Sequence, residues 1–196
     1  MREVIRHSIK WTLGIAVITL VLAALFSVIS TSILEGAGYL LGMMIVLAIV
    51  LMGIFFDMLG IASTAADEVP FHAMAAKKVK GARQGIRVVR NADRFSSFCN
   101  DVIGDISGII SGTASAFVIA KLAIALHYNE GSLNEFIISV IFTSVVAALT
   151  VGGKAFGKTM AIHFSTEIIL QVGKIFYFVE ERFNIVLLND KKKKRN

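Results

Sequence analysis

Four long apolar segments alternate with shorter polar stretches along the 196-residue chain. They cover residues 11–30, 39–66, 98–127 and 133–151. Each is near or above the roughly 17–25 residues that an α-helix needs to cross a bilayer. Only helices or closed barrels satisfy the backbone inside lipid, and these segments are too long for barrel strands. The pattern therefore predicts an all-α integral membrane protein with four transmembrane helices.

The first apolar segment also has one feature of a signal peptide, because Arg2, Arg6 and Lys10 precede it. Its apolar run is longer than the usual core of a signal peptide, and no A-x-A-like cleavage site ends it. We therefore expect a helix that is retained in the protein.

The polar segment 69–94, between the second and third apolar segments, predicts a helical hairpin beside the membrane. Two short amphipathic helices, 69–79 and 82–89, are expected to meet at Lys80-Gly81. Pro70 suits a first helical turn, and Asp67 is placed to cap it. A basic hairpin of this kind can rest on anionic lipid, or it can act as a gate or bind a partner protein.

After the fourth apolar segment, residues 162–188 carry apolar side chains at every third or fourth position. This spacing is typical of an amphipathic helix that lies as a belt in the membrane interface. Residues 1–188 are thus expected to form a single transmembrane domain. Residues 189–196 form a polybasic tail that we expect to be solvated and attracted to anionic lipid.

Composition supports the membrane class. The chain is 56% apolar and 17% charged, with a mean hydropathy of +0.74, whereas soluble domains are typically about 25% charged. A soluble domain of this size could not bury so much apolar surface. The balance argues against a soluble enzyme, a disordered tail and a nucleic-acid-binding module, despite a pI of about 9.6. A single cysteine, Cys99, excludes an internal disulfide framework and any multi-cysteine metal site.

Basic residues predict the orientation. Of the 20 Lys and Arg residues, 19 precede the first helix, lie between the second and third, or follow the fourth. The loops 31–38 and 128–132 contain none. The positive-inside rule then predicts a multi-pass protein of the plasma (cell inner) membrane with both termini in the cytosol. The remaining cation, Lys121, lies near the outer end of the third helix, where it is expected to snorkel.

Acidic and amide residues inside the apolar helices are the candidate site. An acidic residue at the bilayer centre costs about 2.5–3.5 kcal/mol on insertion scales, so it needs a positive companion or water. Asp101 and Asp105, four residues apart, share one helix face. Oxygen ligands of this kind suit Mg²⁺, Ca²⁺ or Na⁺ better than Zn²⁺ or Cu⁺. The candidate ligands are Asp57, Glu68, Asn100, Asp101, Gly104 and Asp105.

Small residues predict how the second and third helices meet. The third carries a doubled G-x-x-x-G-like stripe at Asn100, Gly104, Gly108 and Gly112, and such residues allow close helix approach. The alternative is that the aspartates lie at the cytosolic interface and pair with the basic hairpin. Asp101 follows the hairpin closely, since it is only about 10 Å along a helix from its last basic residue.

Other motifs do not indicate enzyme chemistry. Residues 152–159 match the phosphate-loop pattern G-x-x-x-x-G-K-[ST] letter for letter. That loop works between a strand and a helix, whereas here the motif follows a spanning helix. The four histidines have no metal-ligand spacing, and Cys99 is expected to be an inert buried thiol. We therefore expect no enzyme activity and no nucleic-acid partner.

Three stretches in order resemble the membrane domain of the CNNM/CorC/CorB family of magnesium transport proteins. Residues 65–71, Ala-Ala-Asp-Glu-Val-Pro-Phe, resemble that family's S-x-S-E-T-A-[LF] helix ending. Residues 91–97 and 103–105 resemble N-P-[DE]-R-[FL]-L-[SA] followed by I-G-[NI], with a register slip of one or two residues between the halves. Residues 153–161 resemble G-E-x-x-P-K-T-x-A.

The resemblance implies a homodimer with a dehydrated Mg²⁺ site between the second and third helices, worked by alternating access. Glu68 would be the motif glutamate. Lys154 stands where the family has a glutamate, so it would repel a cation or act as an internal counter-ion. The CBS-pair sensor of the family is not expected in this chain, which leaves a separate cytosolic regulatory protein as a candidate partner beside the lipid bilayer.

Three hypotheses follow. The first is transport of a divalent cation, with Mg²⁺ expected, by a dimeric carrier. The second is a non-transporting membrane adaptor or regulatory protein, in which Lys154 pairs with an aspartate and the hairpin or tail recruits a partner. The third is a carrier coupled to Na⁺ or protons that uses the same acids.

Overall fold

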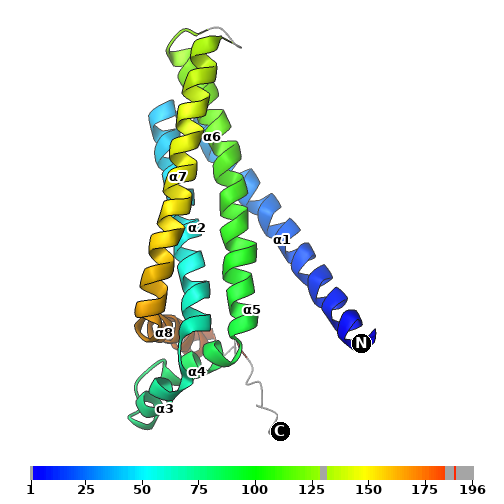
Figure 1. Cartoon of the computed structure of the whole chain (residues 1–196), viewed down its shortest axis with the longest axis vertical. Coiled ribbons are helices and arrows are strands. Elements are labelled where there is room, and N and C mark those ends of the chain that lie inside the picture. The colour runs from blue at the N-terminus through cyan, green and yellow to red at the C-terminus, as the bar shows by residue number, and fades with distance from the viewer. Residues whose placement is uncertain (1, 129–131, 184–187, 189–196) are drawn as a thin grey trace. The chain divides into compact units, whose positions relative to one another are not determined.

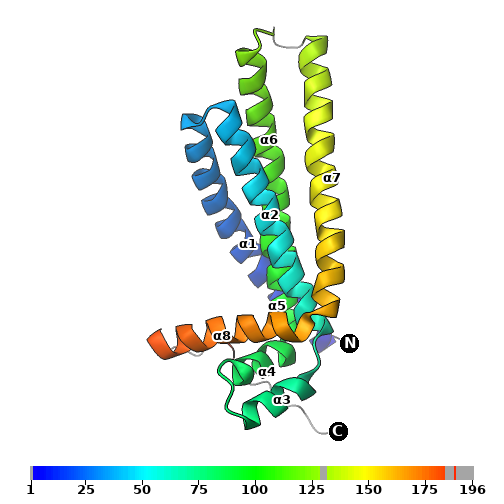
Figure 2. The ribbon, with the colours of Figure 1, turned by 90° about the vertical axis from the view of Figure 1, so that its left-hand side faces the viewer.

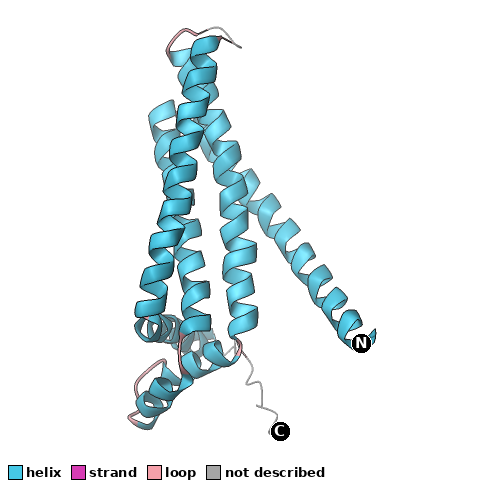
Figure 3. Cartoon of the chain, in the orientation of Figure 1, coloured by secondary structure: helices cyan, strands magenta, loops and turns pink. Residues whose placement is uncertain are grey.

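The computed structural model describes residues 2–128, 132–183 and 188, and within them the chain forms helices and no strand (Figures 1 and 3). Four helical segments are long and apolar enough to span a membrane. The all-α fold with four candidate membrane helices is therefore confirmed. The elements are α1 (Arg2–Gly36), α2 (Tyr39–Ala65), α3 (Glu68–Ala76), α4 (Ala82–Arg90), α5 (Ala92–Ser97), the π-helix η1 (Phe98–Gly104), α6 (Asp105–Ala125), α7 (Leu133–His163) and α8 (Ser165–Phe183).

Two helices are longer than the apolar pattern alone indicates. The third candidate span begins at Ala92, because α5, η1 and α6 follow one another without a break. Helix α7 continues to His163 and contains the whole 152–159 motif. Glycine disfavours a helix interior by only about 1 kcal/mol relative to alanine, so Gly152 and Gly153 do not end α7. The glycine-lysine motif is thus helical and not a phosphate-binding loop.

The expected belt helix at 162–188 corresponds to α8, which is described from Ser165 to Phe183. Residues 184–187 and the polybasic tail at 189–196 lie outside the described residues.

The chain divides into two compact units, each built from two separate stretches of sequence. Unit 1 comprises Met1–Ile54 and Val102–Gly153, and unit 2 comprises Phe55–Asp101 and Lys154–Asn196. In unit 1, α1 packs against α6, and a small core forms around four buried apolar residues. The most apolar windows of α1 and α7 contain no buried residue. Apolar surface of this extent needs a covering phase such as lipid. The four core residues are Leu34, Val46, Ala114 and Val118.

Lys121 has a more specific role in unit 1 than snorkelling. Its ammonium donates hydrogen bonds to the carbonyl oxygens of Leu34, Glu35 and Ala37, at 2.9, 2.9 and 2.6 Å. These carbonyls belong to the C-terminal end of α1 and the residue beyond it. The last carbonyls of a helix have no N–H partner within the helix, and the helix dipole is negative there. The side chain therefore ties the end of α1 to α6.

Unit 2 is organised around α4, which packs on one side against α3 and on the other against α8 (Figure 2). Its apolar core includes five fully buried residues, one of which, Phe71, comes from α3. Glycines allow the closest approach: a Cβ on Gly173 would overlap the Gly81 carbonyl oxygen and lie 3.0 Å from the Gly85 nitrogen. Helices α4 and α8 are thus in backbone contact. The five fully buried core residues are Ala62, Phe71, Val88, Ala161 and Ile169.

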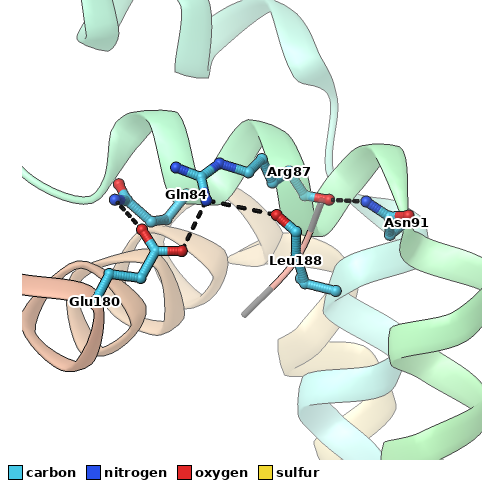
Figure 4. A network of polar contacts seen from close by, with 5 residues as sticks. All are labelled: Gln84, Arg87, Asn91, Glu180 and Leu188. Atoms are coloured by element: carbon cyan, nitrogen blue, oxygen red, sulfur yellow. Dashed lines mark hydrogen bonds and ion pairs between the residues drawn. The ribbon is translucent and has the colours of Figure 1, made fainter. Parts of the chain in front are cut away.

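A polar network fixes the same two helices (Figure 4). The Glu180 carboxylate of α8 accepts hydrogen bonds from Gln84 Nε2 at 2.8 Å and from Arg87 Nη1 at 2.7 Å. Arg87 Nη1 also donates to the Leu188 carbonyl, and Asn91 Nδ2 donates to the Arg87 carbonyl. The Glu180 and Arg87 side chains are only 14% and 20% exposed, so each offsets the desolvation of the other.

Candidate functional site

The centre of the candidate site is the contact between α2 and the π-helix in unit 2. A Cβ on Gly60 would overlap the side-chain amide of Asn100, so an alanine at this position would force that side chain to move. Asn100 Oδ1 is buried and has no hydrogen-bond donor among the described residues. A buried acceptor without a donor costs about 1–3 kcal/mol. The atom is therefore well suited to receive a cation or a donor from outside the chain.

The π-helix explains how Asn100 reaches this position. Residues Phe98–Gly104 wind with one extra residue per turn relative to an α-helix. The change of pitch shifts the register of the backbone hydrogen bonds at the junctions with α5 and α6. Such bulges are frequent at functional sites. The Asn100 amide oxygen is thus a neutral, hard oxygen ligand placed on such a bulge.

Asp57 lies on α2, one turn before Gly60, and forms an ion pair with Lys154 of α7. The Lys154 Nζ–Asp57 Oδ1 distance is 3.4 Å, and the side chains are 30% and 15% exposed. A carboxylate held this far from water needs a positive companion, and in this structure the companion is the lysine. Lys154 thus occupies the place that a bound cation would take beside Asp57.

Glu68 at the start of α3 belongs to a different cluster. Its Oε1 accepts hydrogen bonds from Arg90 Nε at 2.7 Å and from His72 Nε2 at 2.7 Å. The Arg90 hydrogen bond lowers the pKa of Glu68 below its ordinary value of 4.5, the His72 contact acts in the same direction, and partial burial opposes both. Glu68 is therefore engaged by residues of the α3–α4 hairpin.

Asp101 and Asp105 are exposed and form no ion pair within the described chain. Gly104, between them, is buried in unit 1: a Cβ on Gly53 of α2 would lie 3.7 Å from its carbonyl oxygen and 2.9 Å from Ser107 Cβ.

The predicted glycine stripe on α6 is only partly used. Gly108 and Gly112 have no heavy atom within 4 Å of the position that a Cβ would take. The glycines that permit close helix contact with η1 and α6 are instead Gly53 and Gly60 of α2.

The structure brings together only some of the predicted residues. Asp57 meets Lys154, Asn100 meets Gly60, and Glu68 meets Arg90. Across residues 2–128, 132–183 and 188, no group of three His, Cys, Asp or Glu side chains is placed to hold a metal ion. Any cation here would therefore depend on amide, hydroxyl and backbone oxygens as well as carboxylates.

Ser63 was not among the predicted residues, yet it is 1% exposed and donates to the Gly60 carbonyl at 2.7 Å. Its hydroxyl oxygen lies one helical turn from the residue that Asn100 contacts. The sequence feature that could have identified Ser63 is its position three residues after Gly60, which places it on the same face of α2. Comparison of the chain with protein families, with curated proteins and with solved structures found no match.

Proposed function

We propose that the protein carries a divalent cation across the membrane, with Mg²⁺ as the expected substrate. The observation that supports this most is Asn100 Oδ1, a buried oxygen without a donor among the described residues, on a π-helix that faces α2. Amide and backbone oxygens are ligands that Mg²⁺ and Ca²⁺ accept. The residues proposed to line the path are Asp57, Asn100, Asp101, Gly104 and Asp105, with Glu68 at its cytosolic end.

Helix lengths support a common depth for these residues. A span of about 20 residues crosses the hydrocarbon core. Counted from the outer ends at Tyr39, Ala125 and Leu133, such spans end close to Asp57, Asp105 and Lys154 in the three helices. We infer that the acidic residues gather at the cytosolic edge of the core, where a cation entering from the cytosol first loses water.

Lys154 gives this proposal its mechanism. A lysine beside Asp57 acts as a tethered counter-ion that keeps the carboxylate neutralised when no cation is present. A divalent cation that binds Asp57 would displace the ammonium, because two positive charges beside one carboxylate repel each other. Release of the cation would restore the ion pair. The lysine thus couples occupancy of the site to a movement of α7 relative to α2.

The finer features of the architecture belong to the same proposal. We infer a homodimer in the plasma (cell inner) membrane with cytosolic termini, a cytosolic α3–α4 hairpin and α8 as an interfacial belt. The resemblance to the CNNM/CorC/CorB family and the concentration of Lys and Arg in the hairpin and the C-terminal region support this orientation. A separate cytosolic regulatory protein stays a proposed partner.

The test is ion flux into proteoliposomes of the full chain, driven in turn by Mg²⁺, by Na⁺ and by a pH step. Asn100→Ala is expected to lower Mg²⁺ flux about fivefold or more, because it removes a ligand worth about 1 kcal/mol or more. It should not lower the unfolding temperature, since Oδ1 has no partner to lose. Asn91→Ala is the matched control, because Asn91 is buried but its Nδ2 is hydrogen-bonded; it should cost stability and leave flux per folded molecule unchanged.

Mg²⁺ flux equal to that of protein-free vesicles, or equal flux in Asn100→Ala and wild type, would refute divalent-cation transport through this site. Flux that follows Na⁺ or the pH step instead would favour the coupled-carrier hypothesis. Asp57→Asn is expected to reduce Mg²⁺ flux as Asn100→Ala does. If Asp57→Asn transports Mg²⁺ as fast as the wild type, the Asp57 carboxylate has no part in the mechanism.

A second function is favoured by the Asp57–Lys154 ion pair itself, because a persistent pair is what a non-transporting adaptor needs. Under that proposal the pair is structural and the α3–α4 hairpin recruits a partner. The exchange Asp57→Lys with Lys154→Asp separates the two. An adaptor should keep its unfolding temperature and show no flux in any arm, whereas a transporter should transport before the exchange and lose flux after it.

A further inference from the structure

A cavity of about 440 Å³ lies in unit 2 where the α3–α4 turn and α4 face α8. This volume is in the range of small-molecule sites, roughly 300–1,000 Å³. Most of its polar lining is cationic, which sets it apart from the acidic candidate site. The polar and charged residues that line it are Lys78, Lys80, Arg83, Gln84, Arg87 and Tyr177.

Positive charge in this cavity exceeds negative charge. Glu180 neutralises Arg87. In the part of the chain that the structure describes, the side chains of Lys78 and Arg83 form no hydrogen bond or ion pair, and both residues are exposed. Lys80 lies over the ring of Tyr177, with Nζ 5.7 Å from its centroid, a contact that leaves its charge uncompensated. Three cations therefore converge without an acidic partner.

One further acid is near. Glu181 accepts a hydrogen bond from the Tyr177 hydroxyl at 3.3 Å and is exposed to solvent. One exposed carboxylate cannot offset three cations, so the cavity keeps a net positive charge. The turn that carries Lys78 and Lys80 leads directly into α4, which begins at Ala82 with its positive dipole end and carries Arg83.

The turn has a fixed shape. Lys78 has φ of +58° and Gly81 has φ of +85°. Lys78 ends α3 in the usual way, because the Val79 N–H donates to the Met74 carbonyl and the Lys78 N–H donates to the Ala75 carbonyl. Gly81 cannot be replaced freely, because a Cβ would lie 2.5 Å from the Lys174 backbone nitrogen of α8. The end of α3 and the contact with α8 thus hold the backbone that carries Lys78 and Lys80.

We propose that this cavity binds a phosphate group, with Lys78, Lys80 and Arg83 as its charge partners. A phosphomonoester carries a charge of about −1.5 to −2 at neutral pH and three acceptor oxygens, which matches three converging donors better than a single carboxylate does. Arginine adds a planar fork suited to phosphate oxygens. The phosphate can come from a lipid headgroup or from a soluble compound. The proposal does not depend on cation transport.

The experiment measures the unfolding temperature of the full chain in nanodiscs. Four conditions are compared: phosphatidylcholine alone, phosphatidylcholine with phosphatidic acid, phosphatidylcholine with phosphatidylserine, and phosphatidylcholine with inorganic pyrophosphate in the buffer. Stabilisation by phosphatidic acid beyond phosphatidylserine assigns the site to a lipid headgroup. Saturable stabilisation by pyrophosphate assigns it to a soluble phosphate. Both should weaken as salt rises, because screening shortens the range of charge interactions.

Two variants test the residues. The triple variant Lys78→Gln, Lys80→Gln, Arg83→Gln is expected to weaken binding about tenfold or more, from three exposed charge contacts. The matched control removes the same charge outside the cavity, through Lys77→Gln, Lys158→Gln and Arg182→Gln, all at exposed positions.

Lys78→Gly tests whether a loss of binding is caused by a damaged turn, because glycine adopts the left-handed conformation without strain. It should keep or raise the unfolding temperature of the unliganded protein and still weaken binding. The proposal is overturned if neither phosphatidic acid nor pyrophosphate stabilises the wild type, if the control variant loses as much binding as the triple variant, or if Lys78→Gly binds as tightly as wild type.

Discussion

Replacing Gly173 by alanine is expected to separate α8 from α4. The new methyl group would overlap the Gly81 carbonyl oxygen and lie 3.0 Å from the Gly85 nitrogen. Both neighbours are backbone atoms and cannot escape by changing rotamer. The two helices would have to move apart by roughly 1 Å, a gap that forfeits a quarter to a half of each dispersion contact across it.

The magnitude is the balance of two effects. Overpacking of a well-packed interface costs about 1–3 kcal/mol, and a clash with backbone belongs at the upper end. Alanine regains about 1 kcal/mol in a helix interior relative to glycine, which applies to Gly173 because it lies within α8. We therefore expect a net loss of about 2 kcal/mol. For a chain of this length that corresponds to a fall of about 4–8 °C in unfolding temperature.

The protein contains its own reporter for this measurement. Cys99 is the single cysteine and is 1% exposed, so a thiol-reactive fluorescent dye labels it only as the fold opens. Gly152→Ala is the control, because no heavy atom lies within 4 Å of the added methyl; it should be neutral or stabilising by up to about 1 kcal/mol. If Gly173→Ala unfolds at the same temperature as Gly152→Ala, the argument from backbone contact is wrong.

Three further predictions concern polar contacts. Glu180→Ala should cost about 2 kcal/mol by dye labelling, because it strands the partly buried Arg87 guanidinium, and Arg87→Ala should cost a similar amount. Lys121→Met should lower the unfolding temperature by an amount equivalent to about 2 kcal/mol, since three carbonyls lose their donor. Glu68 has a lowered pKa, so its pair with Arg90 stabilises the fold above pH 4.5 and loses this effect as pH falls through the lowered pKa. The unfolding temperature of the wild type should therefore fall with pH in this acid range, and Glu68→Gln should make that fall less steep. An equally steep fall in both proteins would contradict the prediction.

The apolar pattern was sufficient to predict four helices long and apolar enough to span a membrane, because lipid leaves the backbone few alternatives. It was not sufficient to predict where helices end. Helix α7 runs on past the apolar segment to His163, since lysines and a pair of glycines cost too little to stop a helix already formed. Hydropathy therefore predicts which part of a helix can lie in lipid better than it predicts the residue at which the helix ends.

The candidate site shows a similar limit. The sequence indicates that Asp57 needs a positive companion, and Lys154 was one candidate for it. That these two meet at 3.4 Å depends on the rotation of α2 and α7 about their axes, which one sequence does not fix. The orphaned Asn100 oxygen depends on the π-helix, for which residue type gives no reliable signal. The contact of Lys121 with α1 depends on tertiary approach alone.

The π-helix at Phe98–Gly104 has a consequence for how the gene is compared with distant relatives. A π-turn holds one residue more than an α-turn, so it is the structural equivalent of a single-codon insertion. Each residue turns an α-helix by roughly 100°, so an ungapped alignment across this point would assign every later position of the helix to the wrong face.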